Sequence, residues 1–309
     1  MTPSAGIHHI TAICSEPRKN AAFYTRDLGL RMVKKTVNFD DPGSWHLYYG
    51  DETGSPGTVL TFFGRPLARG RNGIGMAVEI AFAIPEQALS YWVKRLEDRG
   101  VGHDALESRF GETVLPLQDP DGGRLELVAV KAVDGPPGWS NGDIPAEHAI
   151  RGFHSASLWL GATEPTARVL TAALGFETIG REGNRHRFVS GGGPLGTMVD
   201  IRAAPNFPAG QQGAGSIHHV AFRAADDNGQ ADMVAALRAL GLKTTEQIDR
   251  HYFRSVYFRE PGGVLFEIAT DQPGFTVDEK REQLGQAIKL PIWCEPNRAE
   301  IEAALPPLD

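Results

Sequence analysis

Four segments of this sequence repeat one spacing between an apolar, strand-like run and the glycine that ends a helix-like run. The spacing is 20 to 22 residues, counted from His9 to Gly29, Glu79 to Gly100, His154 to Gly175 and His219 to Gly241. Strand-like runs separated by turn residues follow each glycine. Internal repetition of this kind predicts a chain built from similar modules. We therefore expect four βαβββ modules and an α+β fold.

The first module shows the expected order of elements most fully. Its strands are predicted at 7–14, 30–39, 45–49 and 58–63, and its helix begins near Pro17 and stops at Gly29. The second and fourth modules end alike, because Pro120 precedes Glu126 and Pro261 precedes Glu267 by six residues each. The matching turns support the repeat.

A segment rich in glycine and proline, 133–142, separates the second module from the third. It predicts an N-terminal domain at 1–132, a linker at 133–149, a C-terminal domain at 150–270 and a tail at 271–309. Apolar and aromatic residues in the tail predict that it packs back across the domains. Helices are expected in it near 278–287 and 297–305.

Composition narrows the class of protein. A hydrophobic content of 41% and a charged content of 22% are typical of a globular chain of 309 residues. The net charge of -7 argues against a nucleic-acid partner, since such proteins usually carry a basic face. No run approaches the roughly 20 apolar residues that span a bilayer, and no secretory signal is evident, so we expect a cytoplasmic protein without a membrane partner. Cys14 and Cys294 are too few for a disulfide framework.

Two histidine pairs, His8-His9 and His218-His219, occupy nearly identical apolar contexts about 210 residues apart. Side chains alternate along a strand, so only one histidine of each pair can face a given side. Glu267 is the one acid in the apolar run 263–269, and a buried carboxylate is costly unless it is paired or bound to a metal. Two histidines and one glutamate form the facial triad of non-haem Fe(II) sites. A lone strand histidine, by contrast, is more often a hydrogen-bonded core or surface residue.

The four modules, the first-strand histidines and the Pro-Gly-Gly-x-x-x-Glu ending resemble the vicinal oxygen chelate superfamily, which includes glyoxalases, bleomycin-resistance proteins and extradiol dioxygenases. Segments 6–11, 33–42 and 46–51 resemble the ring-cleaving dioxygenases that act on hydroquinones. The resemblance implies two domains with curled mixed sheets. It also implies that His9, His219 and Glu267 bind the metal, Fe(II), with Mn(II) as the alternative.

The resemblance leaves one choice of ligand open. His154 in the third module corresponds in position to His9 and would be the first ligand in the more common extradiol arrangement. A second site made of Glu79, Glu126 and His154 also stays open beside its alternative, a remnant whose polar groups hydrogen-bond one another.

Five further residues are candidates for catalysis. The resemblance implies that Arg250 stabilises anionic intermediates and that Tyr257 hydrogen-bonds a substrate oxygen. Thr11 lies two residues after His9 and therefore on the same strand face. The resemblance places His8 and His218 beside the ligands, whereas alternation alone points them away from the metal.

The expected reaction is the O2-dependent opening of a hydroquinone-like aromatic diol by an extradiol-type enzyme, which could be a homo-oligomer. Two other classes stay open. A glyoxalase-like isomerase or lyase would normally use a fourth protein ligand and no O2, and a resistance protein would bind an aromatic drug without a metal.

Overall fold

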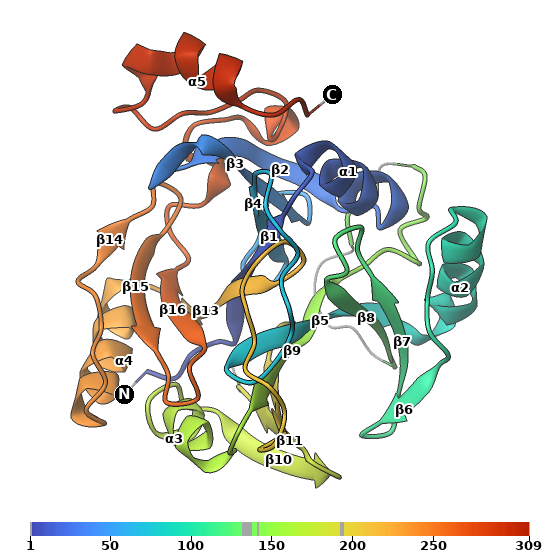
Figure 1. The fold of residues 1–309 in the computed structure, drawn as a ribbon, viewed down its shortest axis with the longest axis vertical. Coiled ribbons are helices and arrows are strands. Elements are labelled where there is room, and N and C mark those ends of the chain that lie inside the picture. Colours follow the sequence, from blue (N-terminus) through green and yellow to red (C-terminus); the bar gives the residue numbers. More distant parts are fainter. Residues whose placement is uncertain (1, 132–137, 141, 192–194, 309) are drawn as a thin grey trace.

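The computed structural model of the protein describes residues 2–131, 138–140, 142–191 and 195–308. Its strands form two eight-stranded sheets, shown in Figure 1. The first sheet contains β1 (Ile7–Cys14), β2 (Arg31–Asn38), β3 (Asp41–Gly50), β4 (Val59–Gly64), β13 (Ile217–Ala224), β14 (Ile248–Asp249), β15 (Arg254–Arg259) and β16 (Leu265–Thr270). The second contains β5 (Met76–Pro85), β6 (Glu107–Arg109), β7 (Glu112–Gln118), β8 (Arg124–Val130), β9 (Gly152–Leu160), β10 (Glu177–Glu182), β11 (Arg185–Val189) and β12 (Met198–Ala203).

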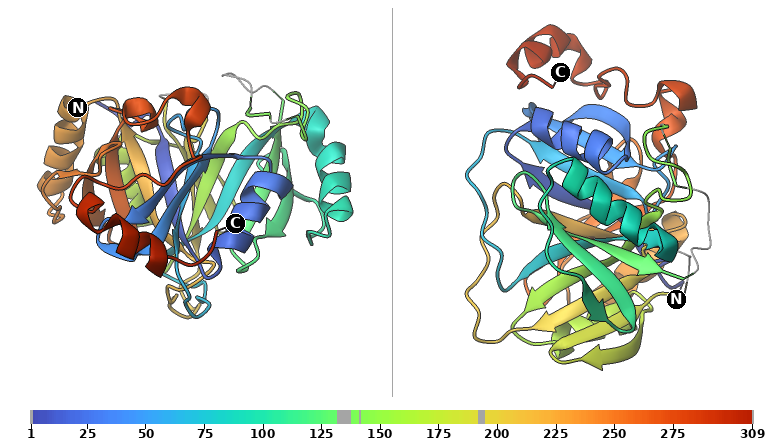
Figure 2. Two further views of the ribbon diagram at one scale, coloured as in Figure 1. Left: turned by 90° about the horizontal axis from the view of Figure 1, so that it is seen from above. Right: turned by 90° about the vertical axis from the view of Figure 1, so that its right-hand side faces the viewer.

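The longer helices lie outside the strands. They are α1 (Pro17–Ala22, extended by a π-helical turn at Phe23–Asp27), α2 (Leu89–Asp98), α3 (Glu164–Ala172) and α4 (Asp227–Ala239). Figure 2 shows α2 and α4 at opposite ends of the molecule. Each buries an apolar stripe against its sheet, through Trp92 and Leu96 in α2 and through Met233 and Leu237 in α4. Within the described residues, no helix is both long and apolar enough to cross a bilayer.

Each sheet joins a module from the first half of the chain to one from the second half. The strand orders are β14-β15-β16-β13-β1-β4-β3-β2 and β10-β11-β12-β9-β5-β8-β7-β6. Modules one and four therefore share one sheet, in which blue and orange strands lie side by side in Figure 1, and modules two and three share the other. The expected α+β fold of curled mixed sheets is confirmed. The expected boundary at 133–149 does not separate the two sheets, and its residues 133–137 and 141 lie outside the described part of the chain.

The C-terminal tail lies over β2 and β3 (Figure 1). The expected helix near 278–287 is wrong, because this stretch contains only a short 3-10 turn at Arg281–Gln283. Buried Lys34 binds the side chains of Asp278 and Glu279, and Gly285 has a φ of 72°, so side-chain contacts and a left-handed residue replace a regular helix. The last expected helix is confirmed as α5 (Arg298–Ala304).

Candidate metal centre

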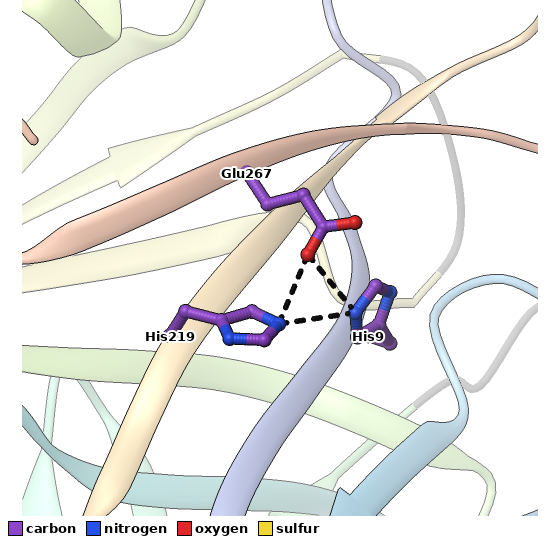
Figure 3. Close-up of side chains that lie close together, drawn as sticks. All are labelled: His9, His219 and Glu267. Carbon is purple, nitrogen blue, oxygen red and sulfur yellow. Dashed lines mark hydrogen bonds and ion pairs between the residues drawn. The ribbon is translucent and has the colours of Figure 1, made fainter. Parts of the chain in front are cut away.

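Three buried side chains from the first sheet converge on one point, as Figure 3 shows. The Nε2 atoms of His9 and His219 are 3.4 Å apart. Glu267 Oε2 lies 2.9 Å from His219 Nε2 and 3.4 Å from His9 Nε2. Among the described residues, this is the one group of three or more potential ligands from His, Cys, Asp and Glu that converges in this way.

Strand register explains the convergence. Ala221 of β13 lies opposite His9 on one neighbouring strand and opposite Glu267 on the other. His219 lies two residues before Ala221 and therefore on the same face of β13. The alanine side chain between them is small and fully buried. The centre is thus built by three adjacent strands that belong to the first and last modules.

His8 and His218 contact His9 and His219 because of two β-bulges. The register between β1 and β13 shifts between Ile7 and His9, and again opposite Thr11 and Ala12, so His8 and His218 are each the extra residue on their strand. His8 Nδ1 lies 2.9 Å from His9 Nδ1, and His218 Nδ1 lies 2.8 Å from His219 Nδ1. Strict alternation, which would point both residues away from the metal, is wrong here because the bulges interrupt it.

The electrostatics of the centre favour ligands with free lone pairs. Burial alone would raise the pKa of Glu267, but His9 and His219 outweigh that effect and hold its pKa well below the usual range. Ser255 Oγ donates a hydrogen bond of 2.5 Å to Glu267 Oε1. Burial lowers the pKa of His219, although the Glu267 carboxylate opposes that shift. Glu267 Oε2 accepts no hydrogen bond of good geometry, which leaves that oxygen available.

The neighbouring histidines are placed to share a proton with His9 and His219. Burial is the main cause that lowers the pKa of His8 and of His218 to about 3, so both rings are neutral. A neutral imidazole has one donor and one acceptor. If His9 and His219 present Nε2 lone pairs, their protons are on Nδ1, where His8 and His218 accept them. Such contacts orient metal-binding histidines.

The geometry fits a divalent transition metal. Ligand atoms held about 2.1 Å from one ion and at right angles to one another lie about 3 Å apart. The three distances observed here, 2.9 Å and twice 3.4 Å, are close to that value. Two imidazoles and one carboxylate on one side of an ion leave its other positions open to the pocket.

A pocket with aromatic walls lies over the centre. It is lined by His9, Thr11, Asn38, Phe39, Asp40, His46, Tyr48, Phe63, His219, Arg250, Phe253 and Tyr257. The Arg250 guanidinium lies 5.4 Å from the centroid of the Tyr257 ring and 3.2 Å from Asp40 Oδ2. Burial, together with the negative charge of Glu267, raises the pKa of Tyr257, so its hydroxyl stays protonated. The structure thus places Thr11, Arg250 and Tyr257 at the pocket, and the catalytic roles expected of them stay predictions.

Several residues of the site were not expected from the sequence. His46 and Tyr48 line the pocket and belong to the segment 46–51, which the resemblance highlighted without a role for any residue in it. Their alternate positions on β3 were the signal that could have identified them. Phe253 lies 4.8 Å from His9, measured between ring centroids, and Ser255 binds Glu267. Both of these belong to the stretch around β15, which was not predicted as a strand.

The corresponding residues of the second sheet do not converge as a ligand group among the described residues. Arg185 binds Glu79 at 2.8 Å, and Arg109 binds Glu126 at 2.6 Å. His154 instead contacts Glu112 at 3.0 Å. Each carboxylate already has a cationic partner, so this region has the character of an ion-pair network. The ligand that converges with His219 and Glu267 is His9.

Comparison with known proteins places this geometry in a family. The model of the Glyoxalase/Bleomycin resistance protein/Dioxygenase superfamily matches residues 6–127 and 152–268. The chain belongs to this superfamily. The Bacillus subtilis protein MhqO, which is named as a ring-cleaving dioxygenase, is 43% identical to this chain over 98% of this chain and 96% of its own length. The chlorohydroquinone/hydroquinone 1,2-dioxygenase of Sphingobium indicum is 34% identical over 96% of this chain and 94% of its own length.

Solved structures show the same relationship. A crystal structure named as a dioxygenase from Bacillus subtilis matches the present structure with a TM-score of 0.96 at 42% identity, and the match covers 100% of the present chain. The match also covers 99% of the Bacillus subtilis chain. Glyoxalase I from Zea mays has a TM-score of 0.64 at 14% identity, over 86% of this chain and 92% of its own. The second similarity shows the shared fold only.

Proposed function

We propose that this chain is a non-haem Fe(II)-dependent, extradiol-type dioxygenase that opens the ring of a hydroquinone-like aromatic diol with O2. The observation that carries the proposal is the buried group His9, His219 and Glu267 at one side of an aromatic pocket. The full-length similarity to proteins named ring-cleaving dioxygenases, including one named for hydroquinones, supports it.

Iron bound at this centre would supply open positions that bring the diol and O2 together and pass electron density between them. His9, His219 and Glu267 would hold the ion, and the aromatic walls of the pocket would exclude water. Mn(II) would use the same oxygen and nitrogen ligands and is the alternative ion.

Three pocket residues handle charge and protons in this proposal. Arg250 has a permanent positive charge and stabilises anionic oxygen atoms that develop on the ring. Tyr257 is half-buried and stays protonated, so it donates a hydrogen bond to a substrate oxygen. Thr11 lies on the same strand face as His9 and places a hydroxyl next to the oxygen nearest the ligands.

His8 and His218 act behind the ligands. Each accepts the Nδ1 proton of its neighbour, which orients the ring and keeps the Nε2 lone pair directed at the ion. We propose that this is their principal role.

The other two classes fit the site less well. A glyoxalase-like isomerase would normally use a fourth protein ligand, and the group found among the described residues has three members. A drug-binding resistance protein would need the pocket but not a buried ligand set. Cytoplasmic location and assembly as a homo-oligomer belong to the proposal as expectations.

Oxygen uptake tests the proposal directly. Protein reconstituted anaerobically with Fe(II) is mixed with 18O2 and each member of a panel of para- and ortho-diols. We expect oxygen uptake with a para-diol and 18O in the ring-opened product. Glu267→Gln should abolish uptake, while Glu126→Gln, at the corresponding position of the other sheet, should retain it. Absence of uptake with every diol, together with anaerobic isomerisation of a thiohemiacetal, would overturn the proposal.

A further inference from the structure

Four side chains form one continuous hydrogen-bonded chain beside the pocket. The Tyr48 hydroxyl lies 2.9 Å from His46 Nδ1, and His46 Nε2 lies 2.9 Å from Thr61 Oγ1. Thr61 Oγ1 lies 3.0 Å from Thr11 Oγ1. Thr11, His46 and Tyr48 line the pocket, and the Thr61 side chain is fully buried behind them. Both ends of the chain therefore reach the pocket.

The geometry of one bond sets the direction of all the others. Thr61 donates its single hydroxyl proton to Thr11, so it must accept from His46 Nε2–H. Burial holds the pKa of His46 well below its usual range, so the ring has one proton only. His46 Nδ1 then accepts, and Tyr48 donates to it.

With this direction, one end of the hydrogen-bonded series offers the pocket an acceptor and the other end offers it a donor. The Tyr48 proton is directed at His46, so the Tyr48 oxygen offers only lone pairs to the pocket. Thr11 accepts from Thr61, so its own proton is free for the pocket. The donor, Thr11, lies on β1, the strand of His9. Thr11 pairs with Thr61 on the neighbouring strand β4, and Thr61 pairs with Tyr48 on β3. The acceptor end is thus two strands away from the ligand strand, a spacing of roughly 10 Å between backbones.

We propose that Tyr48 is a specificity-determining residue that accepts a hydrogen bond from the second, protonated hydroxyl of the substrate. The inference rests on the proposed function and deepens it. An oxygen near the ligands meets the Thr11 donor, while a hydroxyl on the far side of the ring meets the Tyr48 acceptor. A para-diol has its oxygens on opposite sides of the ring and satisfies both ends. An ortho-diol has them side by side and does not.

Anaerobic binding measurements test this assignment without turnover. The probes are hydroquinone and 4-fluorophenol, because fluorine is close in size to a hydroxyl but cannot donate. A hydrogen bond between neutral groups typically changes affinity by about 3- to 10-fold, so the unmodified protein should prefer hydroquinone by this ratio. Tyr48→Phe should reduce the ratio to about one and leave the affinity for 4-fluorophenol nearly unchanged.

Matched variants separate this role from a general effect on packing. Tyr49→Phe deletes the same atom from the next residue, whose hydroxyl binds Asn20 in the core, and should keep the preference. Thr61→Val removes the acceptor of His46 Nε2–H, which frees the imidazole to change tautomer and should weaken the preference. Thr61→Ser should restore it. A full preference in Thr61→Val would overturn the direction assigned to the chain.

The two proposals fail in different ways. If hydroquinone is preferred and Tyr48→Phe loses that preference, but no diol consumes O2, the proposed function is wrong and the assignment of Tyr48 stands. If O2 is consumed and Tyr48→Phe keeps the preference for hydroquinone, the assignment is overturned and the proposed function stands.

Discussion

His8 Nδ1 lies 2.9 Å from His9 Nδ1, although the two residues are neighbours in one strand. The same relationship recurs between His218 and His219 at 2.8 Å. In each case a β-bulge turns the first histidine toward the ring of the second. The contact suits the tautomer that presents Nε2 to the centre, and it orients the rings of His9 and His219 before any ion binds.

Loss of one ligand should remove the metal. We expect His9→Ala to lower the metal affinity by at least about 100-fold, because changes even in residues behind a ligand cost 10- to 100-fold. His154→Ala, at the corresponding position of the other sheet, should retain full metal content. Elemental analysis of both purified variants measures this. Metal loss in His154→Ala with full occupancy in His9→Ala would place the centre in the third module.

Removal of the metal should leave the fold intact. The sheets bury an extensive apolar core that includes Ile10, Leu60 and Phe266, and a core of this size does not depend on an ion. We expect an unchanged far-ultraviolet circular dichroism spectrum after chelation. The melting temperature should fall, since a ligand at 1,000 times its Kd contributes about 4 kcal/mol. Global unfolding at room temperature would contradict this expectation.

Tyr257→Phe should separate binding from turnover. The substitution deletes only the hydroxyl, which stays protonated because burial raises its pKa. A positioned proton donor contributes about 100-fold or more, so oxygen uptake at saturating substrate should fall about 100-fold with metal content unchanged. Tyr49→Phe serves as the control. Equal oxygen uptake in Tyr257→Phe and the unmodified protein would show that Tyr257 lines the pocket without a catalytic role.

Glu79→Gln should change stability in a pH-dependent way and leave metal content unchanged. Burial alone would raise the pKa of Glu79, but Arg185, Arg124 and Arg109 outweigh it and lower the pKa. A carboxyl whose pKa is lowered by folding stabilises the protein above its ordinary pKa, and that contribution is lost as the pH falls. We expect the free energy of unfolding to fall by about 2 kcal/mol at pH 7, because the arginines near Glu79 lose a buried charged partner.

Urea unfolding at a series of pH values measures this effect. The difference in the free energy of unfolding between Glu79→Gln and the unmodified protein should shrink as the pH falls below 4.5, the ordinary pKa of a glutamate. Glu97→Gln, at an exposed position of α2, should show no comparable loss. A difference that does not depend on pH would show that the charge of Glu79 is not responsible.

Lys34→Met should release the C-terminal tail. The fully buried Lys34 ammonium binds Asp278 at 2.6 Å and also binds Glu279. Removing one partner of a buried ion pair costs about 3–5 kcal/mol, since a buried charge is left without compensation. We expect lower stability and faster proteolysis after residue 271. Lys35→Met removes only a weak contact with the Gln286 carbonyl at 3.4 Å and should behave like the unmodified protein.

Local patterns carried much of the fold. The β1 strand is predicted at its observed bounds because the segment from Ile7 to Cys14 is mostly apolar and rich in β-branched residues. Gly29, Gly100, Gly175 and Gly241 follow the helices of their modules at positive φ. The polar edge strand β10 (Glu177–Glu182) was missed, because its exposed residues show no apolar alternation. The repeat itself therefore follows from residues close together in the chain.

Tertiary structure decided how the modules combine and which side chains meet. The sequence by itself marked His9, His219 and Glu267 through repeated context and an isolated acid. Only the register across Ala221 brings their atoms within 3.4 Å. Pairing between strands about 200 residues apart leaves no local pattern, because it depends on the register of remote hydrogen bonds. The bulges at the histidine pairs and the chain from Thr11 to Tyr48 arise from that pairing, and so does the chemistry we propose for this pocket.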